Sequence, residues 1–209
     1  MTLLLAFDTA TPQVGVALHD GEEVIAELVS DRSMKHGEQL APMIAAALAE
    51  VGAVRQDLTA VAVGAGPGPF TGLRVGLVTA RTLAFALDIP VYAACSLDVI
   101  AVECLSLGVT GPFTVATDAR RKEVYLARYD ELGHRLDGPE VVRPADAATD
   151  QPTAGEGALL YPAAFTAPFG PTRPSAGWLA RAVTEELVEL LDPEPLYLRR
   201  PDAVAAADR

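Results

Sequence analysis

The sequence predicts an α/β protein of two lobes, each a mixed sheet flanked by helices, with the second lobe reduced. Short apolar runs of strand length alternate with longer stretches of helical periodicity. The opening pattern also returns further along the chain. A strand ending in Asp8 is followed six residues later by Val14, and a strand ending in Asp118 is followed six residues later by Val124. Because the two copies are offset by 110 residues, from Asp8 to Asp118, they indicate a duplicated unit.

Residues 1–108 are expected to form the complete first lobe. Apolar runs separated by turn residues predict its strands, and apolar positions three and four apart predict its helices. Gly52 ends the first helix, and Pro90 follows the second. The expected strands are Leu3–Asp8, Val14–His19, Val24–Val29, Ala60–Val63 and Pro90–Ala94, and the expected helices are Gly37–Val51, Leu73–Leu87 and Leu97–Leu107.

Residues 109–201 are expected to form the reduced second lobe, and residues 202–209 a loosely held tail. Two apolar runs predict strands at Phe113–Asp118 and Val124–Tyr129. The stretch 150–177 is rich in Pro, Gly and Ala, and it offers one weak strand, Ala158–Tyr161. A strong helix follows, with Ser175 as its N-cap. Its expected apolar face consists of Trp178, Leu179, Ala182, Val183, Leu187, Leu190 and Leu191.

The composition is that of a globular protein with a sizeable core. Of the 209 residues, 50% are hydrophobic and 21% are charged, and the mean hydropathy is +0.25. The formal net charge is −12, with an isoelectric point near 4.6. Nucleic-acid binding requires basic surface that neutralises phosphates. We therefore expect any work on a nucleic acid to go through a partner.

Three further features favour a cytoplasmic protein. No apolar stretch rich in Leu, Ile and Val approaches the ~20 residues that a membrane helix needs. The segment Met1–Asp8 lacks the basic start of a signal peptide. Cys95 and Cys104 are too few for a disulfide or zinc framework, so we expect two reduced thiols.

The first strand ends in Asp8-Thr9-Ala10-Thr11. In the actin and sugar-kinase superfamily, a strand–Asp–turn–strand unit in each of two lobes holds ATP, and the phosphate loop has the pattern Asp-x-Gly-Thr. Here Ala10 stands in place of the glycine, and its Cβ hinders the approach of backbone amides to a phosphate. We therefore favour turn formation as the role of Asp8, Thr9 and Thr11, with nucleotide binding as the alternative.

The Gly-rich segment Gly66–Gly76, GPGPFTGLRVG, is the most distinctive in the chain. It lacks the Gly-Lys-Ser/Thr ending of a Walker A loop and does not fit the Rossmann fingerprint. Taken alone, it is either a strand-to-helix loop with Thr71 near the cap or an anion site at a helix N-terminus.

Taken together with other segments, this loop closely resembles the TsaB family, the small bacterial partners of the TsaD threonylcarbamoyl transferase. The family signature residues are Gly66, Pro67, Gly68, Phe70, Thr71, Gly72 and Arg74. The resemblance covers most of residues 1–130 and is weak over residues 145–175. The other matching segments are Asp8–Thr11, His36–Ile44, Leu83–Pro90, Asp118–Arg120, Glu123–Tyr125 and Pro195–Arg199.

The resemblance implies an actin-like (ASKHA) fold and a non-catalytic subunit without cofactors. In the family, TsaB supports TsaD in a complex that also includes an ATPase, TsaE. That complex transfers threonylcarbamoyl from its adenylate to N6 of adenosine 37 in tRNA, so tRNA would be met only through the complex. The alternative is a small-molecule phosphotransferase of the same superfamily, which would need the missing glycine of the phosphate loop and a complete second lobe.

The sequence also lacks the histidines of the catalytic members. TsaD carries a His-x-x-x-His pair that can chelate one metal, whereas Ser96 and Ile100 fill those positions here. The three histidines, His19, His36 and His134, include no pair four residues apart. We therefore expect no metal site and no catalytic residue, which excludes a metallopeptidase.

Other polar residues are expected to have local roles. His36 would be solvated or would cap the first helix. Asp98, Asp118 and Glu123 would lie at the surface or in turns. The basic run Arg120-Arg121-Lys122 would form a solvated turn, with a phosphate contact as the alternative.

Two strips of small residues predict where a partner binds. The strips are Ala41, Ala45 and Ala49 on the first helix, and Gly76, Ala80 and Ala84 on the second. The family resemblance favours a partner interface on these helices. The alternative is that the two strips pack against each other within one chain. The sequence does not decide between a monomer and a homodimer for the chain when alone.

Overall fold

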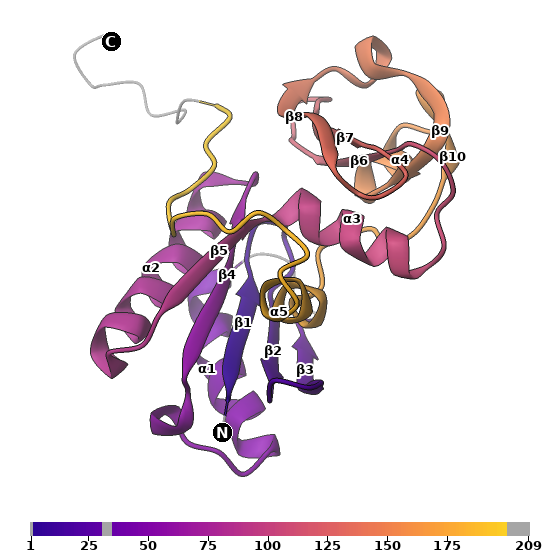
Figure 1. Cartoon of the computed structure of the whole chain (residues 1–209). Coiled ribbons are helices and arrows are strands. Elements are labelled where there is room, and N and C mark those ends of the chain that lie inside the picture. The colour runs from indigo at the N-terminus through magenta and orange to yellow at the C-terminus, as the bar shows by residue number, and fades with distance from the viewer. Residues whose placement is uncertain (1, 31–34, 200–209) are drawn as a thin grey trace, which may run out of the picture.

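The computed structural model describes residues 2–30 and 35–199 and contains two five-stranded mixed sheets (Figure 1). The first sheet has the strand order β3-β2-β1-β4-β5. Strands β1 and β2 pair antiparallel, and β1, β4 and β5 run parallel. Its strands are β1 (Leu4–Asp8), β2 (Gly15–His19), β3 (Val24–Val29), β4 (Ala60–Gly66) and β5 (Val91–Cys95). The predicted tail at 202–209 lies outside the described residues.

The second sheet repeats this plan strand for strand. Its order is β8-β7-β6-β9-β10, with β6 antiparallel to β7 and parallel to β9. Asp8 and Asp118 end the two central strands, β1 and β6. The duplication predicted from the sequence is therefore confirmed. The strands are β6 (Phe113–Asp118), β7 (Val124–Tyr129), β8 (Arg135–Val142), β9 (Thr149–Ala154) and β10 (Phe165–Pro168).

The second lobe is reduced in its helices rather than in its sheet. Between β4 and β5 lies the 18-residue helix α2 (Phe70–Leu87), whereas α4 (Glu156–Leu160), between β9 and β10, has five residues. The 15-residue α1 (His36–Glu50) corresponds in order to the four-residue 3₁₀ turn Pro144–Ala147. The predicted strand at Ala158–Tyr161 is wrong, because that segment contains most of α4.

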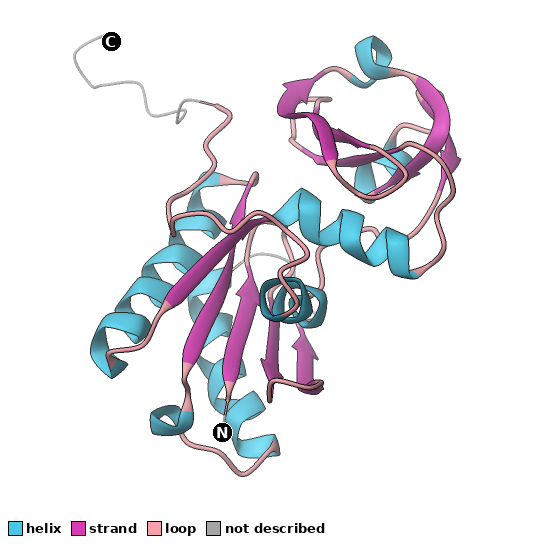
Figure 2. Cartoon of the chain, viewed as in Figure 1, coloured by secondary structure: helices cyan, strands magenta, loops and turns pink. Residues whose placement is uncertain are grey.

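Helices cover both faces of the first sheet, as Figure 2 shows. On one face, Leu40 and Ile44 of α1 and Leu73 of α2 join the core formed with Leu5 and Phe7 of β1. On the other face, Leu179 of α5 (Ala176–Thr184) packs with Leu4 and Ala6. Helix α3 (Ser96–Ser106) lies between the lobes, where Val99 packs with the α5 cluster and Ile100 packs with Phe113 of the second sheet.

Helix α5 is shorter than predicted. Its N-cap is Ser175 as expected, since the Ser175 side chain accepts a hydrogen bond of 3.1 Å from the Trp178 amide. The helix ends at Thr184, so the predicted apolar positions Leu187, Leu190 and Leu191 do not belong to it. Leu191 instead exchanges backbone hydrogen bonds with Ala93, which covers the edge of β5.

Helix α2 is long and apolar enough to cross a membrane by length and composition, with a mean hydropathy of 1.3. In this fold it packs one side on the first sheet through Leu73, Leu77 and Ala80. Its opposite side carries exposed apolar side chains, with Val78 61% and Phe85 90% exposed. We interpret α2 as a core helix with one uncovered apolar face.

Candidate functional site

Asp8 lies at the end of β1 and is only 2% exposed. Its Oδ1 accepts a hydrogen bond of 2.7 Å from the Ala10 amide, and its Oδ2 accepts one of 2.6 Å from the Ser96 hydroxyl. Burial raises the pKa of Asp8 above its ordinary value, and the hydrogen bonds from Ser96 and Ala10 act in the opposite direction. Both carboxylate oxygens therefore have partners within the chain.

The backbone of the Gly-rich segment packs directly on this loop. A Cβ added at Gly68 would lie 2.2 Å from the carbonyl oxygen of Ala10, and one at Gly72 would lie 2.3 Å from the carbonyl oxygen of Thr9. A Cβ at Gly76 would lie 2.4 Å from Thr9 Oγ1. Gly68 and Gly72 are needed because two stretches of backbone come too close for a side chain between them, and Gly76 is needed because the Thr9 hydroxyl occupies the space.

The hydroxyls of the Asp8–Thr11 loop are also used inside the chain. Thr9 Oγ1 donates a hydrogen bond of 2.8 Å to the carbonyl of Gly72, and Thr11 Oγ1 donates a longer one of 3.4 Å to the carbonyl of Gln13. His36 begins α1, and its Nε2 lies 2.7 Å from the carbonyl oxygen of Thr11. The hydroxyls of this loop thus have partners within the chain, and the Gly-rich segment packs against the carbonyl groups of Thr9 and Ala10.

Helix α2 begins earlier than predicted, at Phe70, with Pro69 at the N-cap position. Thr71 therefore belongs to the first helical turn and is not the cap. The guanidinium of Arg74 lies 4.2 Å from the ring centroid of Phe70, and this ring stacks on Tyr197 at 5.0 Å. Phe70 thus packs on the segment that follows α5, and Arg74 packs on Phe70.

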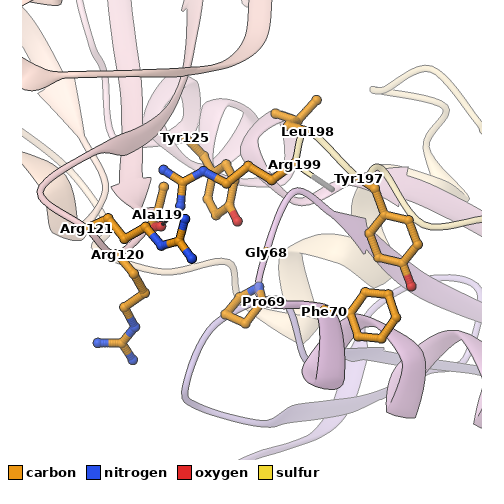
Figure 3. Close-up of a pocket in the computed structure, with 10 residues that line it drawn as sticks. All are labelled: Gly68, Pro69, Phe70, Ala119, Arg120, Arg121, Tyr125, Tyr197, Leu198 and Arg199. Atoms are coloured by element: carbon orange, nitrogen blue, oxygen red, sulfur yellow. Dashed lines mark hydrogen bonds between the residues drawn. The ribbon is translucent and has the colours of Figure 1, made fainter. Parts of the chain in front are cut away.

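A pocket of about 190 Å³ lies where this segment meets both lobes (Figure 3). It is lined by the start of α2, the β6–β7 turn and residues 197–199. Arg199 donates a hydrogen bond of 2.7 Å to the carbonyl of Ala119 and pairs with Glu123. The lining residues are Gly68, Pro69, Phe70, Ala119, Arg120, Arg121, Tyr125, Tyr197, Leu198 and Arg199.

This pocket was not predictable from the sequence, because its residues come from three distant segments. Two motifs of the sequence build most of it, the Gly-rich segment and Pro195–Arg199. The basic run forms a turn as predicted, with the Arg120 guanidinium 3.3 Å from the Asp118 carboxylate. Nothing in the sequence indicated that Arg199 would approach that turn.

Asp98 departs from its predicted surface role. It is 8% exposed and accepts a hydrogen bond of 2.7 Å from the Tyr129 hydroxyl. Arg135 donates to both of its carboxylate oxygens at 3.1 Å. Burial raises the pKa of Asp98, and the contacts with Tyr129 and Arg135 lower it. Because Asp98 lies on α3 and its partners on β7 and β8, this cluster joins the lobes.

The two small-residue strips have different environments. Ala41, Ala45 and Ala49 are exposed on α1, whereas Gly76, Ala80 and Ala84 are buried in α2. A Cβ on Gly76 would meet Thr9 and Val63 of the chain's own first lobe. The prediction of a partner contact at these three α2 residues is therefore wrong, since their side of α2 faces the sheet. The alternative, that the strips pack on each other, is also wrong for the exposed α1 strip.

Among the described residues, no group of three His, Cys, Asp or Glu side chains could hold a metal ion. Ser96 and Ile100, which stand where TsaD has histidines, are both buried. Ser96 is engaged with Asp8, and Ile100 has no atom that ligates metals.

Comparisons with known proteins agree with this fold. A family model described as "TsaD: tRNA N6-adenosine threonylcarbamoyltransferase" matches residues 24–169. An uncharacterised Mycobacterium tuberculosis protein is 44% identical over 97% of this chain and 94% of its own length. A Bacillus subtilis protein named "tRNA threonylcarbamoyladenosine biosynthesis protein TsaB" is 36% identical to this chain. The match covers 60% of this chain and 54% of the Bacillus subtilis protein.

The solved structure of YeaZ from Pseudomonas aeruginosa superimposes with a TM-score of 0.76 at 31% identity. The match covers 95% of this chain and all of the YeaZ chain. Similarity of this extent in both sequence and fold, together with the family model, identifies the family. The chain belongs to the TsaB family, whose named relatives are tRNA threonylcarbamoyladenosine biosynthesis proteins.

Proposed function

We propose that this protein is a non-catalytic scaffold subunit that supports a TsaD-type transferase in tRNA threonylcarbamoyladenosine biosynthesis. The observation that carries the proposal is the packing of the Gly-rich segment on the Asp8–Thr11 loop. Gly68, Gly72 and Gly76 approach Ala10 and Thr9 so closely that a Cβ on any of them would clash. A phosphate-binding loop must keep its amides open to the ligand, whereas the Ala10 amide here donates to the Asp8 carboxylate.

Ser96 provides further support for a structural role. The residue at this position begins α3, and its hydroxyl donates to the buried Asp8 carboxylate. It thus ties the start of α3 to the end of β1, where a TsaD-like protein would hold a metal ligand. We infer that the side chains of this region stabilise the lobe instead of supplying catalysis.

We propose that the partner covers the neighbouring helices α1 and α2. Both lie on the same face of the first sheet (Figure 1). Their uncovered sides carry Ala41, Ala45 and Ala49 on α1 and Val78 and Phe85 on α2. Exposed apolar side chains on one helix and small residues on the other suit close packing against the helices of a partner. A homodimer of the isolated chain would use the same surface.

The net charge of the chain and its family suggest how tRNA and a further protein subunit take part. A chain with a net charge of −12 is unsuited to binding the tRNA backbone broadly, so we propose that the transferase supplies most of the tRNA contact. We also propose that a TsaE-like ATPase joins the complex and that the complex acts in the cytoplasm.

Co-expression tests the proposal. The tagged chain should retain a TsaD-like protein from the same cell, raise its threonylcarbamoyl transfer to tRNA, and transfer nothing alone. Transfer by this chain alone, in a preparation shown to lack host TsaD, would overturn the scaffold role. Failure of the two proteins to associate would overturn the partnership.

A further inference from the structure

We propose that residues 185–199, the segment after α5, form a strap that fixes the angle between the two lobes. The strap leaves the end of α5, crosses the first lobe and ends against the second lobe. The chain itself thus sets the orientation of its lobes, without a ligand bound between them. This conformational role goes beyond the scaffold function and does not depend on which partner the protein binds.

The strap is attached firmly to the first lobe, where it runs beside β4 and β5 (Figure 1). Leu191 exchanges backbone hydrogen bonds of 2.8 and 3.3 Å with Ala93 of β5. The Leu196 amide donates a hydrogen bond of 2.9 Å to the carbonyl of Ala65 in β4. Side chains of the strap also contact α2, through the ion pair of Glu194 with Arg81 and the stacking of Tyr197 on Phe70.

The end of the strap is attached to the second lobe by Arg199. Its guanidinium donates a hydrogen bond of 2.7 Å to the carbonyl of Ala119 and pairs with the Glu123 carboxylate. In Figure 3 the Arg199 side chain extends from the strap toward the turn between β6 and β7. The side chains of Arg199 and Glu123 are only 25% and 29% exposed. A charged hydrogen bond that is largely shielded from water is stronger than one at the surface.

This attachment lies far from the polar contact that joins the lobes at α3. There, Asp98 near the start of α3 accepts hydrogen bonds from Tyr129 and Arg135 of the second lobe. Glu123 directly precedes β7 and Tyr129 ends it. The two attachments are therefore about 15–20 Å apart, at ~3.3 Å per residue. Two bodies that touch along one helix can still rotate about it, whereas a second attachment at this distance prevents the rotation.

Apolar side chains of the strap fill the boundary between the lobes. Leu191 and Leu196 pack both against the core of the first lobe and against the cluster that α3 forms with the second sheet. Leu198 packs against the second of these clusters. Contacts between the parts of one chain usually allow relative motion unless the interface is large and apolar. The strap enlarges this interface and makes it more apolar.

The test measures the distance between two spin labels, one on each lobe, by pulsed electron paramagnetic resonance. The labels are attached to Val54→Cys in the first lobe and Leu159→Cys in the second, since both side chains are exposed. The native Cys95 and Cys104 are fully buried and remain unlabelled. The labelled full chain is mixed with an excess of unlabelled chain, so that only distances within one chain are measured. We expect a single narrow distribution of distances.

Arg199→Ala removes the attachment of the strap to the second lobe. Arg81→Ala is the matched control, because it removes the same charge and an ion pair of the strap, but that pair of 2.8 Å with Glu194 joins the strap to the first lobe only. We expect the distribution to widen by about twofold, or to split in two, for Arg199→Ala, and to stay that of the parent chain for Arg81→Ala. An unchanged distribution for Arg199→Ala, or equal widening in both variants, would overturn the proposal.

Glu123→Gln removes the ion pair from the side of the second lobe and should widen the distribution as well. Thermal denaturation of each variant, followed by circular dichroism, establishes that it is folded at the temperature of labelling. If Arg199→Ala does not fold, Glu123→Gln decides by the same criterion, and a distribution equal to that of the parent chain would then overturn the proposal. Because no partner is present, these outcomes do not depend on the scaffold role.

Discussion

The Ser96 hydroxyl lies 2.6 Å from Asp8 Oδ2 and donates a buried hydrogen bond to it. The two residues are far apart in sequence but meet where β1 ends and α3 begins. A Cβ added at Gly64 would lie 1.9 Å from the same oxygen, so only glycine at this position leaves room for the carboxylate. This contact holds the end of the central strand to the helix between the lobes.

We expect Ser96→Ala to lower the free energy of unfolding by about 1–3 kcal/mol. The substitution removes one of the donors to a buried carboxylate and leaves that oxygen unsatisfied. Urea denaturation at neutral pH measures the change. Ser106→Ala is the control, because Ser106 makes a hydrogen bond of 2.7 Å to a backbone carbonyl at an exposed site. Equal losses for both variants would contradict a special role for the Ser96–Asp8 contact.

Gly72→Ala should destabilise the protein by about 1–3 kcal/mol, the usual range for overpacking a dense interior. Gly72 is helical, so alanine would otherwise favour α2. The cost arises because the new Cβ would lie 2.3 Å from the carbonyl oxygen of Thr9. Gly37→Ala in α1 is the matched control, since the nearest atom to its Cβ is 3.9 Å away. A stabilised Gly72→Ala variant would show that the two backbones are not tightly packed.

The raised pKa of Glu103 predicts that the free energy of unfolding depends on pH. Burial, assisted by the charge of Glu27, raises the pKa of Glu103 from 4.5 to about 7. The folded state therefore holds this proton more tightly than the unfolded state. The contribution of this protonated carboxyl group to the free energy of unfolding is fully present below pH 4.5, and it is lost as the pH rises through about 7.

We therefore expect Glu103→Gln, which resembles the protonated form, to be more stable than the parent chain at pH 8. The advantage should disappear toward pH 5. Thermal denaturation across this range measures the difference, with Glu50→Gln at the exposed end of α1 as the control. A Glu103→Gln curve parallel to that of the parent chain at all pH values would contradict the prediction.

The sequence predicted the strands that have strong apolar patterns and missed those that do not. Strands β1, β2, β6 and β7 are fully or largely buried and apolar. In contrast, β9 has the sequence TDQPTA, and both β9 and β10 contain a proline. Their pairing depends on the neighbouring strand β6 rather than on their own propensity. The duplicated topology was predictable from two Asp-ending strands, but the full second sheet was not.

The sequence also did not show which side of each helix faces the core. Spacing alone placed Gly76, Ala80 and Ala84 on one side of a helix, and that grouping is right. Which side faces the sheet depends on tertiary packing, which the small residues do not specify. The leucines at 187, 190 and 191 had helical spacing as well, yet the chain leaves the helix at Thr184 and Leu191 pairs with β5.

The exposed strip on α1 provides the sharpest test of the partner surface. Ala45 is exposed in the isolated chain, so Ala45→Glu should leave its stability within about 0.5 kcal/mol of the parent. In a helix–helix interface the same substitution would bury a charge without a partner. We expect the free energy of binding to a TsaD-like protein to weaken by about 2–5 kcal/mol. In a pull-down, the variant would then no longer retain the partner.

Ala145→Glu is the matched control, because Ala145 is an exposed alanine in the 3₁₀ turn of the second lobe, away from α1. Thermal denaturation and pull-down are measured on both variants. An Ala45→Glu chain that melts like the parent and still retains the partner would place the interface elsewhere. One that loses the partner while Ala145→Glu retains it would locate the interface on α1, since the two variants carry the same added charge.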